Sequence, residues 1–458
     1  RRPLPGGARW AVGRLWRGAR GRPVRVADLA GCRVAVWGTG SEGGAFARLL
    51  RSRGGDPVIV DDRPGGTGVV PPTADLLRSV DVVVRSPGVC RYRPELVEAE
   101  AHGVEVTTPM ALWLAEMAGQ PVLAVTGTKG KSTTATLAAA ILRAAGLDVA
   151  LAGNIGVPVT DLMGGPRHDA YVVEVSSYQA ADVTVGAAVT VVTLLAPDHL
   201  DWHGGVEAYY RDKLRLVTTV PDHPVAVSTA SADALERTSG LPARTLYGDR
   251  GLVVVSGGRL LAGGEPVASL DRFRARGAHN ALNAAGALAG ATLLAGPPPA
   301  GAVADALEGF EPLPSRSRPI GDWGGLEFVD DALASNPSAT AATLASYDAR
   351  AVGLIVGGAD RGVDLGPLAG AVARHRGELT VVAVPPGGGR FVEALVEARP
   401  GLAAAEAPGI DEAVALLVGS VSPGGAILFS PGAPTPDGEG GYRARAAQFA
   451  AAAVRHTA

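Results

Sequence analysis

Cysteine is scarce in this chain: Cys32 and Cys90 are the only two in 458 residues. Two cysteines cannot build a disulfide framework, and neither has the His or Cys neighbours of a zinc site. This composition favours a reducing, cytoplasmic location. The sequence also lacks a run of about 18 apolar residues free of charge, which argues against a transmembrane helix and integral membrane association.

An excess of charge of one sign is also missing. The formal net charge is −3, so no general attraction to nucleic acid is expected, and a polyanionic ligand must be held by a local site. Residues 1–25 are rich in Arg but lack an apolar core followed by a cleavage site, which argues against a secretory signal. We expect a disordered basic extension here; the alternative is a weak contact with the anionic inner membrane surface.

Internal repeats are absent, and short β-branched runs alternate with Ala/Leu-rich stretches almost throughout. This alternation is typical of parallel sheets covered by helices, and the chain is too long for one hydrophobic core. We therefore expect an α/β protein with three domains, at 26–118, 119–313 and 314–458. Examples of the expected strands are Arg33–Trp37, Val58–Val60, Val82–Val84, Val122–Val125, Tyr171–Val175, Val189–Leu194, Gly353–Val356, Thr380–Val384 and Ala426–Phe429.

The strongest chemical signal is a phosphate-binding loop. The strand Val122–Val125 is followed by Gly127-Thr128-Lys129-Gly130-Lys131-Ser132-Thr133 and then by a helical run. Backbone N–H groups and a helix dipole converge at such a turn, where a triphosphate can sit. Lys131 is expected to reach the β- and γ-phosphates and Ser132 to ligate Mg²⁺. Val125 stands where the usual P-loop has a glycine, which disfavours a generic P-loop kinase.

The first domain carries a second glycine-rich turn. A strand is followed by Gly38-Thr39-Gly40-Ser41-Glu42-Gly43, and Asp61 and Asp62 end the next strand. Taken alone, this pattern is a dinucleotide fingerprint, in which the glycines admit a diphosphate and an acid reaches a ribose. Such a run is weak evidence by itself, and a nicotinamide cofactor would leave the ATP loop unexplained.

The loop from Gly127 to Thr133 resembles the nucleotide loop of the muramyl (Mur) ligases and of the folylpolyglutamate synthetases. Further motifs match in the family's order, and the resemblance runs from about Val34 to the end of the chain. These motifs are Ser86-Pro87-Gly88-Val89, Asn154-Ile155-Gly156, Glu174-Val175-Ser176-Ser177-Tyr178-Gln179, Asp198-His199-Leu200-Asp201-Trp202-His203, Lys213, Gly277-Ala278-His279-Asn280-Ala281-Leu282-Asn283, Pro314-Ser315-Arg316 and Val329-Asp330-Asp331.

The resemblance implies a Rossmann-like UDP-binding domain, a central P-loop-type ATP-binding domain and a C-terminal Rossmann-like domain. It implies ATP and two Mg²⁺ ions as cofactors, with Ser132, Glu174 and His199 as metal ligands. Lys213 occupies the position of a lysine that the family carbamylates, and a carbamate turns a cation into an anionic oxygen ligand. The implied catalytic residues are Lys131, Glu174, His199, Lys213 and Arg316. The implied ATP contacts are Gly127, Thr128, Lys129, Gly130, Lys131, Ser132, Thr133, Asn280, Asn283, Arg316 and Asp331.

The implied UDP-substrate contacts are Gly38, Thr39, Gly40, Asp61, Asp62, Ser86, Pro87, Gly88, Asn154, Ser176 and Gln179.

Departures from the family's D-glutamate ligase lie where that enzyme holds its amino acid, and Leu333 replaces its carboxylate-pairing lysine. A dicarboxylate that loses one cation must bind along another vector, because an unpaired buried carboxylate is costly. The implied glutamate contacts are Ser335, Arg361, Ser430, Thr435 and Tyr442.

The implied activity is addition of glutamate to UDP-N-acetylmuramoyl-L-alanine through an acyl phosphate, in peptidoglycan precursor synthesis. The phrases around Gly38 and His199 resemble the branch that adds L-glutamate and leaves its inversion to a separate epimerase. The D-glutamate ligase is the alternative. A folylpolyglutamate synthetase, which needs no UDP-binding domain, and an inactive nucleotide-binding scaffold are more distant alternatives.

Overall fold

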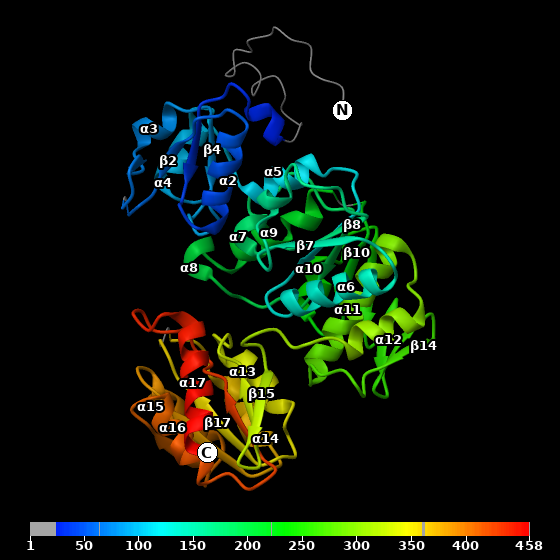
Figure 1. Cartoon of the computed structure of the whole chain (residues 1–458), viewed down its shortest axis with the longest axis vertical. Helices are drawn as coiled ribbons and strands as arrows, with labels where there is room; N and C mark the ends of the chain where they lie inside the picture. Colours follow the sequence, from blue (N-terminus) through cyan, green and yellow to red (C-terminus); the bar gives the residue numbers. More distant parts are fainter. Residues whose placement is uncertain (1–23, 64, 221, 360–361, 458) are drawn as a thin grey trace. The chain divides into compact units, whose positions relative to one another are not determined.

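The computed structural model describes residues 24–63, 65–220, 222–359 and 362–457. Residues 1–23 of the predicted basic extension therefore lie outside the described residues. The chain forms two compact units (Figure 1). The first unit comprises the chain up to Asp271 together with Leu282–Leu307. The second unit comprises Arg272–Ala281 and Glu308–Ala458. No helix in the described part of the chain is long and apolar enough to cross a membrane.

The first sheet of unit one is wholly parallel, with the strand order β3-β2-β1-β4-β5. Both faces of this sheet are buried, as expected when helices cover a parallel sheet on each side. Its strands are β1 (Val34–Trp37), β2 (Val58–Val60), β3 (Val69–Val70), β4 (Val82–Arg85) and β5 (Glu105–Thr107). The helical segments around it are η1 (Val26–Leu29), α2 (Ser41–Ser52), α3 (Ala74–Arg78), α4 (Pro94–Ala101) and α5 (Pro109–Glu116).

The second sheet of unit one carries the phosphate loop. Its order is β14-β13-β12-β11-β10-β9-β6-β8-β7, and the pairs are parallel except those of the β12-β13-β14 meander. The strands are β6 (Val122–Thr126), β7 (Val149–Gly153), β8 (Ala170–Glu174), β9 (Val189–Val192), β10 (Val225–Ser228), β11 (Arg244–Gly248), β12 (Val253–Ser256), β13 (Arg259–Ala262) and β14 (Glu265–Ser269). The helical segments are α6 (Lys131–Ala144), η2 (Val159–Leu162), α7 (Ser177–Ala180), α8 (Leu200–His203), α9 (Val206–Thr218), α10 (Ala232–Arg237), α11 (Ala278–Ala295) and α12 (Ala300–Glu308).

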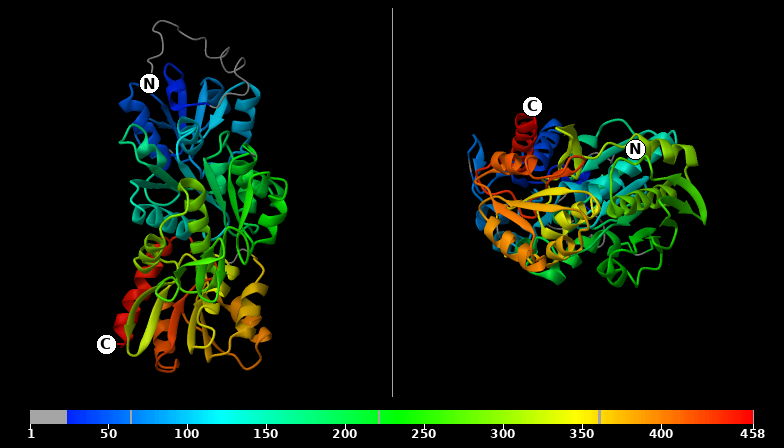
Figure 2. Two further views of the ribbon diagram at one scale, coloured as in Figure 1. Left: turned by 90° about the vertical axis from the view of Figure 1, so that its right-hand side faces the viewer. Right: turned by 90° about the horizontal axis from the view of Figure 1, so that it is seen from below.

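Unit two is a six-stranded sheet in the order β15-β16-β20-β17-β18-β19, parallel except for the β15–β16 hairpin. Helices cover both faces, with α17 (red) on one side and α13 and α14 on the other (Figure 2). The strands are β15 (Arg318–Trp323), β16 (Leu326–Asp330), β17 (Val352–Val356), β18 (Leu379–Ala383), β19 (Ala403–Glu406) and β20 (Ala426–Phe429). The helices are α13 (Pro337–Ala345), α14 (Gly366–Arg374), α15 (Gly388–Ala398), α16 (Ile410–Val418) and α17 (Gly441–Thr457).

Candidate active site

The phosphate loop joins β6 to α6 and has no room for side chains at two of its positions. Gly127 has φ +140°, and a Cβ there would lie 2.0 Å from Thr193 Oγ1. Gly130 has φ +91°, and a Cβ there would lie 2.3 Å from Asn283 Oδ1. Gly130 is the N-cap residue of α6, and no side chain caps the N–H groups of the first turn. The backbone N–H groups of that turn therefore suit an anion such as a phosphate.

Hydrogen bonds from neighbouring elements fix the shape of this loop. Thr128 N donates to Leu194 O at 2.6 Å, and Thr128 Oγ1 lies 2.6 Å from the hydroxyl of Tyr209 in α9. On the other side, Thr193 Oγ1 donates to Lys129 O at 2.7 Å. The segment after β9 and the helix α9 thus hold the loop in place before any nucleotide binds.

Ser132 and Glu174 form the part of the site best suited to a metal ion. Ser132 Oγ donates to Glu174 Oε2 at 2.5 Å, and Asn154 Nδ2 donates to Glu174 Oε1 at 2.8 Å. No cluster of three or more His, Cys, Asp or Glu side chains suited to a metal occurs among residues that the structure describes. A hydroxyl and one carboxylate nevertheless fit Mg²⁺, which usually keeps several waters and takes further oxygens from phosphates.

Charged groups surround the loop on the side of α8. Lys131 Nζ donates to Thr128 O at 3.1 Å, and Lys129 Nζ lies 3.6 Å from Asp198 Oδ2. His199 follows with φ 52° and a side chain that is 48% exposed. Burial lowers the pKa of His199 from its usual range, which favours the neutral imidazole that metals bind.

Lys213, on α9, is buried beneath the loop. Its Nζ donates to Gly127 O at 2.8 Å and lies 5.0 Å from the ring centroid of Tyr209. Burial, and next the charge of Lys131, hold the pKa of Lys213 well below its usual range. The neutral amine is therefore favoured at this position. An amine offers no anionic oxygen, so a metal role for Lys213 requires covalent modification.

The glycine-rich turn of the first sheet is equally close-packed. A Cβ at Gly43 would lie 2.0 Å from Gly38 O, and Ser86 Oγ donates to Gly38 O at 3.0 Å. Thr39 donates to Asp61 Oδ2 through both its backbone N and its Oγ1, each at 2.8 Å. The predicted substrate residues Gly38, Thr39, Gly40, Asp61, Ser86, Pro87 and Gly88 therefore belong to one region at the carboxyl ends of β1, β2 and β4.

One other predicted substrate residue, Gln179, reaches this turn from the second sheet, next to Ser176. Ser176 caps α7, and Gln179 Nε2 donates to Glu42 Oε1 at 2.6 Å. Burial raises the pKa of Glu42 to about 7. Asp62, in contrast, forms an ion pair with Arg93 at 2.6 Å. The contact between Gln179 and Glu42 brings the substrate residues of the two sheets together.

The predicted adenine contacts fall on different units. Asn283 belongs to unit one, where its Oδ1 faces Gly130 and accepts from Thr134 Oγ1 at 3.4 Å. Asn280 belongs to unit two, and its Nδ2 donates to Arg276 O at 2.8 Å. Asn283 is therefore placed beside the phosphate loop, and Asn280 bonds to the segment that precedes α11 within its own unit.

In unit two, Asp331 and Ser430 come together at the ends of β16 and β20. Asp331 Oδ2 accepts from Ser430 Oγ and Thr343 Oγ1, both at 2.7 Å, and Ser317 N donates to Oδ1 at 2.9 Å. Burial raises the pKa of Asp331 to about 6. Of the other predicted residues, Ser335 is exposed, Thr435 is half-buried and Tyr442 packs against the core. Arg316 precedes β15 between Ser315 and Ser317, and Arg361 lies outside the described residues.

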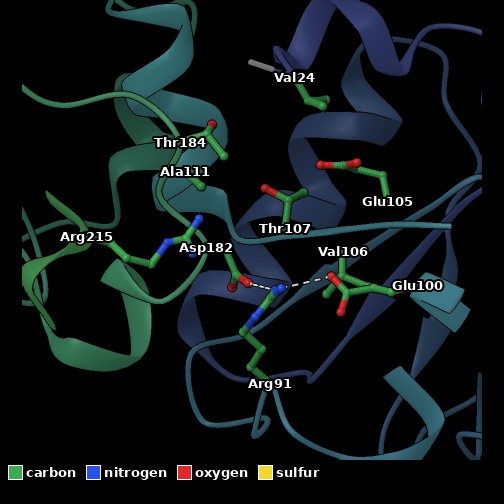
Figure 3. Close-up of a pocket in the computed structure, with 10 residues that line it drawn as sticks. All are labelled: Val24, Arg91, Glu100, Glu105, Val106, Thr107, Ala111, Asp182, Thr184 and Arg215. Atoms are coloured by element: carbon green, nitrogen blue, oxygen red, sulfur yellow. Dashed lines mark hydrogen bonds and ion pairs between the residues drawn. The ribbon is translucent and has the colours of Figure 1, made fainter. Parts of the chain in front are cut away.

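Sequence reasoning missed a buried ionic cluster between the two sheets of unit one. Arg85 and Asp182 form an ion pair with side chains 0% and 1% exposed. Arg91 pairs with Asp182 and, at 2.9 Å, with Glu100, beside a cavity of about 110 Å³ (Figure 3). The sequence feature that could have indicated this cluster is Arg85, a charged residue at the end of the apolar strand β4. Removing one partner of such a pair typically costs about 3–5 kcal/mol, because it leaves an unpaired buried charge.

Known proteins match almost the whole chain. It is 40% identical over 462 residues to the UDP-N-acetylmuramoyl-L-alanine–L-glutamate ligase of Salinispora tropica, covering 95% of this chain and 100% of that protein. It is 35% identical over 456 residues to the protein of the same name from Xanthomonas axonopodis pv. citri, covering 93% and 96%. Residues 125–246 match the family described as Mur ligase middle domain. The chain belongs to the Mur ligase family.

Solved structures support the fold of this Mur ligase. UDP-N-acetylmuramate–alanine ligase from Thermotoga maritima superposes with a TM-score of 0.60 at 19% identity, covering 92% of this chain and 98% of that one. MurF ligase from Thermotoga maritima in complex with ADP gives 0.59 at 15% identity, covering 93% and 94%. The predicted α/β fold is confirmed, with three mainly parallel sheets, as are the family, its ATP-dependent ligase class and the resemblance to the L-glutamate branch.

Replacing Gly130 with alanine should abolish tight nucleotide binding. An L-residue at this φ costs roughly 1–2 kcal/mol, and the new Cβ meets Asn283 Oδ1. We expect at least about tenfold weaker ATP binding by calorimetry, equivalent to about 1.4 kcal/mol. Gly146→Ala is the matched control, because Gly146 has φ +95° but open space around its Cβ. Equal ATP affinity in both variants would contradict the packing argument.

Asp331 should make unit two less stable as its carboxyl ionises. Its folded pKa of about 6 exceeds the ordinary 3.8, so the unfolded chain loses this proton first. The stabilising contribution is complete below pH 3.8 and is lost as the pH rises through 6. We expect the calorimetric stability of the wild type to fall over this range relative to Asp331→Asn. A constant difference between the two proteins would show that Asp331 does not titrate as described.

Proposed function

We propose that this Mur ligase joins L-glutamate to the alanyl carboxylate of UDP-N-acetylmuramoyl-L-alanine in peptidoglycan precursor synthesis. The observation that carries the proposal is the match, over 95% of the chain, to a relative with this name. The site supports it, because an anion-binding loop and a glycine-rich turn are linked through Gln179 and Glu42 within one unit. An inactive scaffold would not need Lys131, Glu174, His199 and Lys213 together around one loop.

The reaction requires two anions to approach each other. The alanyl carboxylate attacks the γ-phosphorus of ATP, the bond to ADP breaks, and an acyl phosphate forms. The amine of glutamate then attacks the acyl carbon and phosphate leaves, so that an amide, ADP and phosphate result. Lys131 and Arg316 are proposed to neutralise charge on the transferring phosphoryl group. No side-chain nucleophile is needed in either step.

We propose that two magnesium ions assist this reaction. Ser132 and Glu174 would hold one ion, since their oxygens already meet at 2.5 Å. His199 and a carbamylated Lys213 would hold the other. Bound ions supply charge stabilisation for the phosphoryl group. The burial of Lys213 supports its modification, because burial favours the neutral amine and only a neutral amine can add to carbon dioxide.

Glutamate is proposed to bind in unit two, near Ser335, Arg361, Ser430, Thr435 and Tyr442. Leu333 stands where the D-glutamate ligases carry a lysine that pairs with a carboxylate of glutamate. Without this lysine the carboxylate must point in another direction, which supports binding of the L enantiomer. Such a product contains L-glutamate, so we further propose that a separate epimerase inverts it. We expect the reaction to take place in the cytoplasm, where ATP and nucleotide-linked precursors are available.

The choice of enantiomer can be measured directly. Purified protein with ATP, Mg²⁺ and UDP-N-acetylmuramoyl-L-alanine is given L- or D-glutamate, and amide product and phosphate are quantified. We expect kcat/KM for L-glutamate to exceed that for D-glutamate at least about tenfold, or about 1.4 kcal/mol in transition-state stabilisation. Lys131→Ala serves as the blank. Efficient use of D-glutamate alone would refute the proposed specificity.

Carbamylation of Lys213 should depend on dissolved carbon dioxide. We expect activity to fall in carbon dioxide-depleted buffer and to return with bicarbonate, because the carbamate supplies the metal's anionic oxygen. With ¹³C-bicarbonate, NMR should show a carbamate carbon in the wild type and none in Lys213→Arg. Full activity without carbon dioxide, and no carbamate resonance, would rule out the modification.

A further inference from the structure

A chain of hydrogen bonds, buried except at the half-exposed Tyr92, runs beside the phosphate loop. His203 Nδ1 lies 2.7 Å from Asp212 Oδ2, and His203 Nε2 lies 3.0 Å from Ser177 Oγ. The hydroxyl of Tyr92 donates to the same carboxylate, at 2.6 Å from Oδ2 and 2.8 Å from Oδ1. Ser177, His203 and Asp212 are each at most 3% exposed. We call these four residues the Tyr92–Ser177 chain.

The partners of His203 indicate which of its two ring nitrogens carries the hydrogen in the neutral imidazole. An ionised carboxylate only accepts hydrogen bonds, so Nδ1 of His203 carries the proton that points to Asp212. In the neutral imidazole Nε2 then accepts from the hydroxyl of Ser177. The order Ser–His–Asp is that of hydrolase triads, but Ser177 is only 3% exposed. Its Oγ is closed off from a substrate, so the arrangement is structural rather than nucleophilic.

The helix α9 connects this chain to the phosphate loop. Tyr209, Asp212 and Lys213 follow the three- and four-residue spacing of one helix face. Tyr209 meets Thr128 Oγ1 at 2.6 Å and Lys213 donates to Gly127 O at 2.8 Å, so both hold the loop. The ring of His203 also packs edge-on against Tyr209, with centroids 5.3 Å apart.

The other members of the chain lie next to the proposed substrate residues. Ser177 directly follows the substrate residue Ser176, and His203 ends α8, which begins one residue after the proposed metal ligand His199. Tyr92 lies four residues after Gly88, in a segment that Cys90 also ties to α8 through Trp202 O at 3.1 Å. The chain therefore joins the segment after β4, α8 and α9 at the carboxylate of Asp212, and His203 extends it to α7.

We propose that the Tyr92–Ser177 chain is a positioning device, which sets the distance between the nucleotide-linked acceptor and the γ-phosphate. This inference rests on the proposed ligase function. Through α9, Asp212 couples the substrate segments to the loop that Tyr209 and Lys213 hold. A positional error of about 1 Å at a reacting centre can lower a rate on the order of 10²-fold. Asp212 and His203 are thus positioning residues and do not touch the reacting atoms.

The test variant is His203→Phe, which keeps a ring against Tyr178, Trp202 and Tyr209 but removes both hydrogen bonds. We expect kcat to fall on the order of 10²-fold, with a raised KM for UDP-N-acetylmuramoyl-L-alanine. The affinity for ATP alone, measured by calorimetry without acceptor, should stay within about twofold, because the loop keeps its contacts to Tyr209 and Lys213.

A matched control is His223→Phe. His223 is also buried, with its Nε2 3.1 Å from Thr190 Oγ1 at the opposite end of β9 from the phosphate loop. It should lose comparable thermal stability while keeping kcat within about twofold of the wild type. Conservative rescue is provided by Asp212→Asn, whose amide oxygen still accepts from His203 Nδ1. This variant should retain much more activity than Asp212→Leu.

The outcomes separate this inference from the proposed function. Absence of product with the wild-type protein would refute the ligase function itself. With an active wild type, an unchanged kcat in His203→Phe would overturn the inference, as would an equal loss in His223→Phe. A loss of ATP affinity that parallels the loss of kcat would also overturn it, because the chain would then act on the loop and not on the acceptor.

Discussion

The close approach of the phosphate loop to its neighbours is the constraint on which the rest of the site depends. The loop passes so near Thr193 and Asn283 that no Cβ fits at Gly127 or Gly130. This packing turns the backbone N–H groups of the first turn of α6 toward one point. It also brings Ser132 against Glu174 and places Lys213 directly beneath the loop. In a less compact turn, the N–H groups of α6 and the side chains of Ser132, Glu174 and Lys213 would not lie around one point.

Buried polar contacts connect the sheet that carries the phosphate loop to the first sheet of unit one. Arg85 and Asp182 form an ion pair between the two sheets of unit one, and Gln179 reaches Glu42 across the same boundary. Buried charges are tolerated only when they are paired, so each contact has a defined partner and direction. These polar contacts therefore restrict the position of the glycine-rich turn of the first sheet with respect to the phosphate loop. Apolar packing alone would allow many closely similar arrangements.

Much of the fold was predictable because its strands are short apolar runs between clear breaks. Of the nine strands named from the sequence, β2 and β20 begin and end at the predicted residues, and the ends of the other seven differ by one or two residues. The strands β12, β13, β14 and β15 were not named in advance, since they are partly exposed and mix polar with apolar residues. Strands β3, β5, β7, β10, β11, β16 and β19 were also not named from the sequence. Nor does the sequence reveal that α11 begins in unit two and continues in unit one.

The sequence by itself determined the family, the phosphate loop and the order of the motifs around it, because these depend on residue types at short spacing. Only the tertiary structure decided that Arg85 pairs with Asp182, and that His203 joins Ser177 to Asp212. Each of these residues is ordinary in its local sequence, and its partner lies on another segment. Such pairings are selected by burial, which removes water as a competing partner, and burial exists only after the sheets and helices have packed.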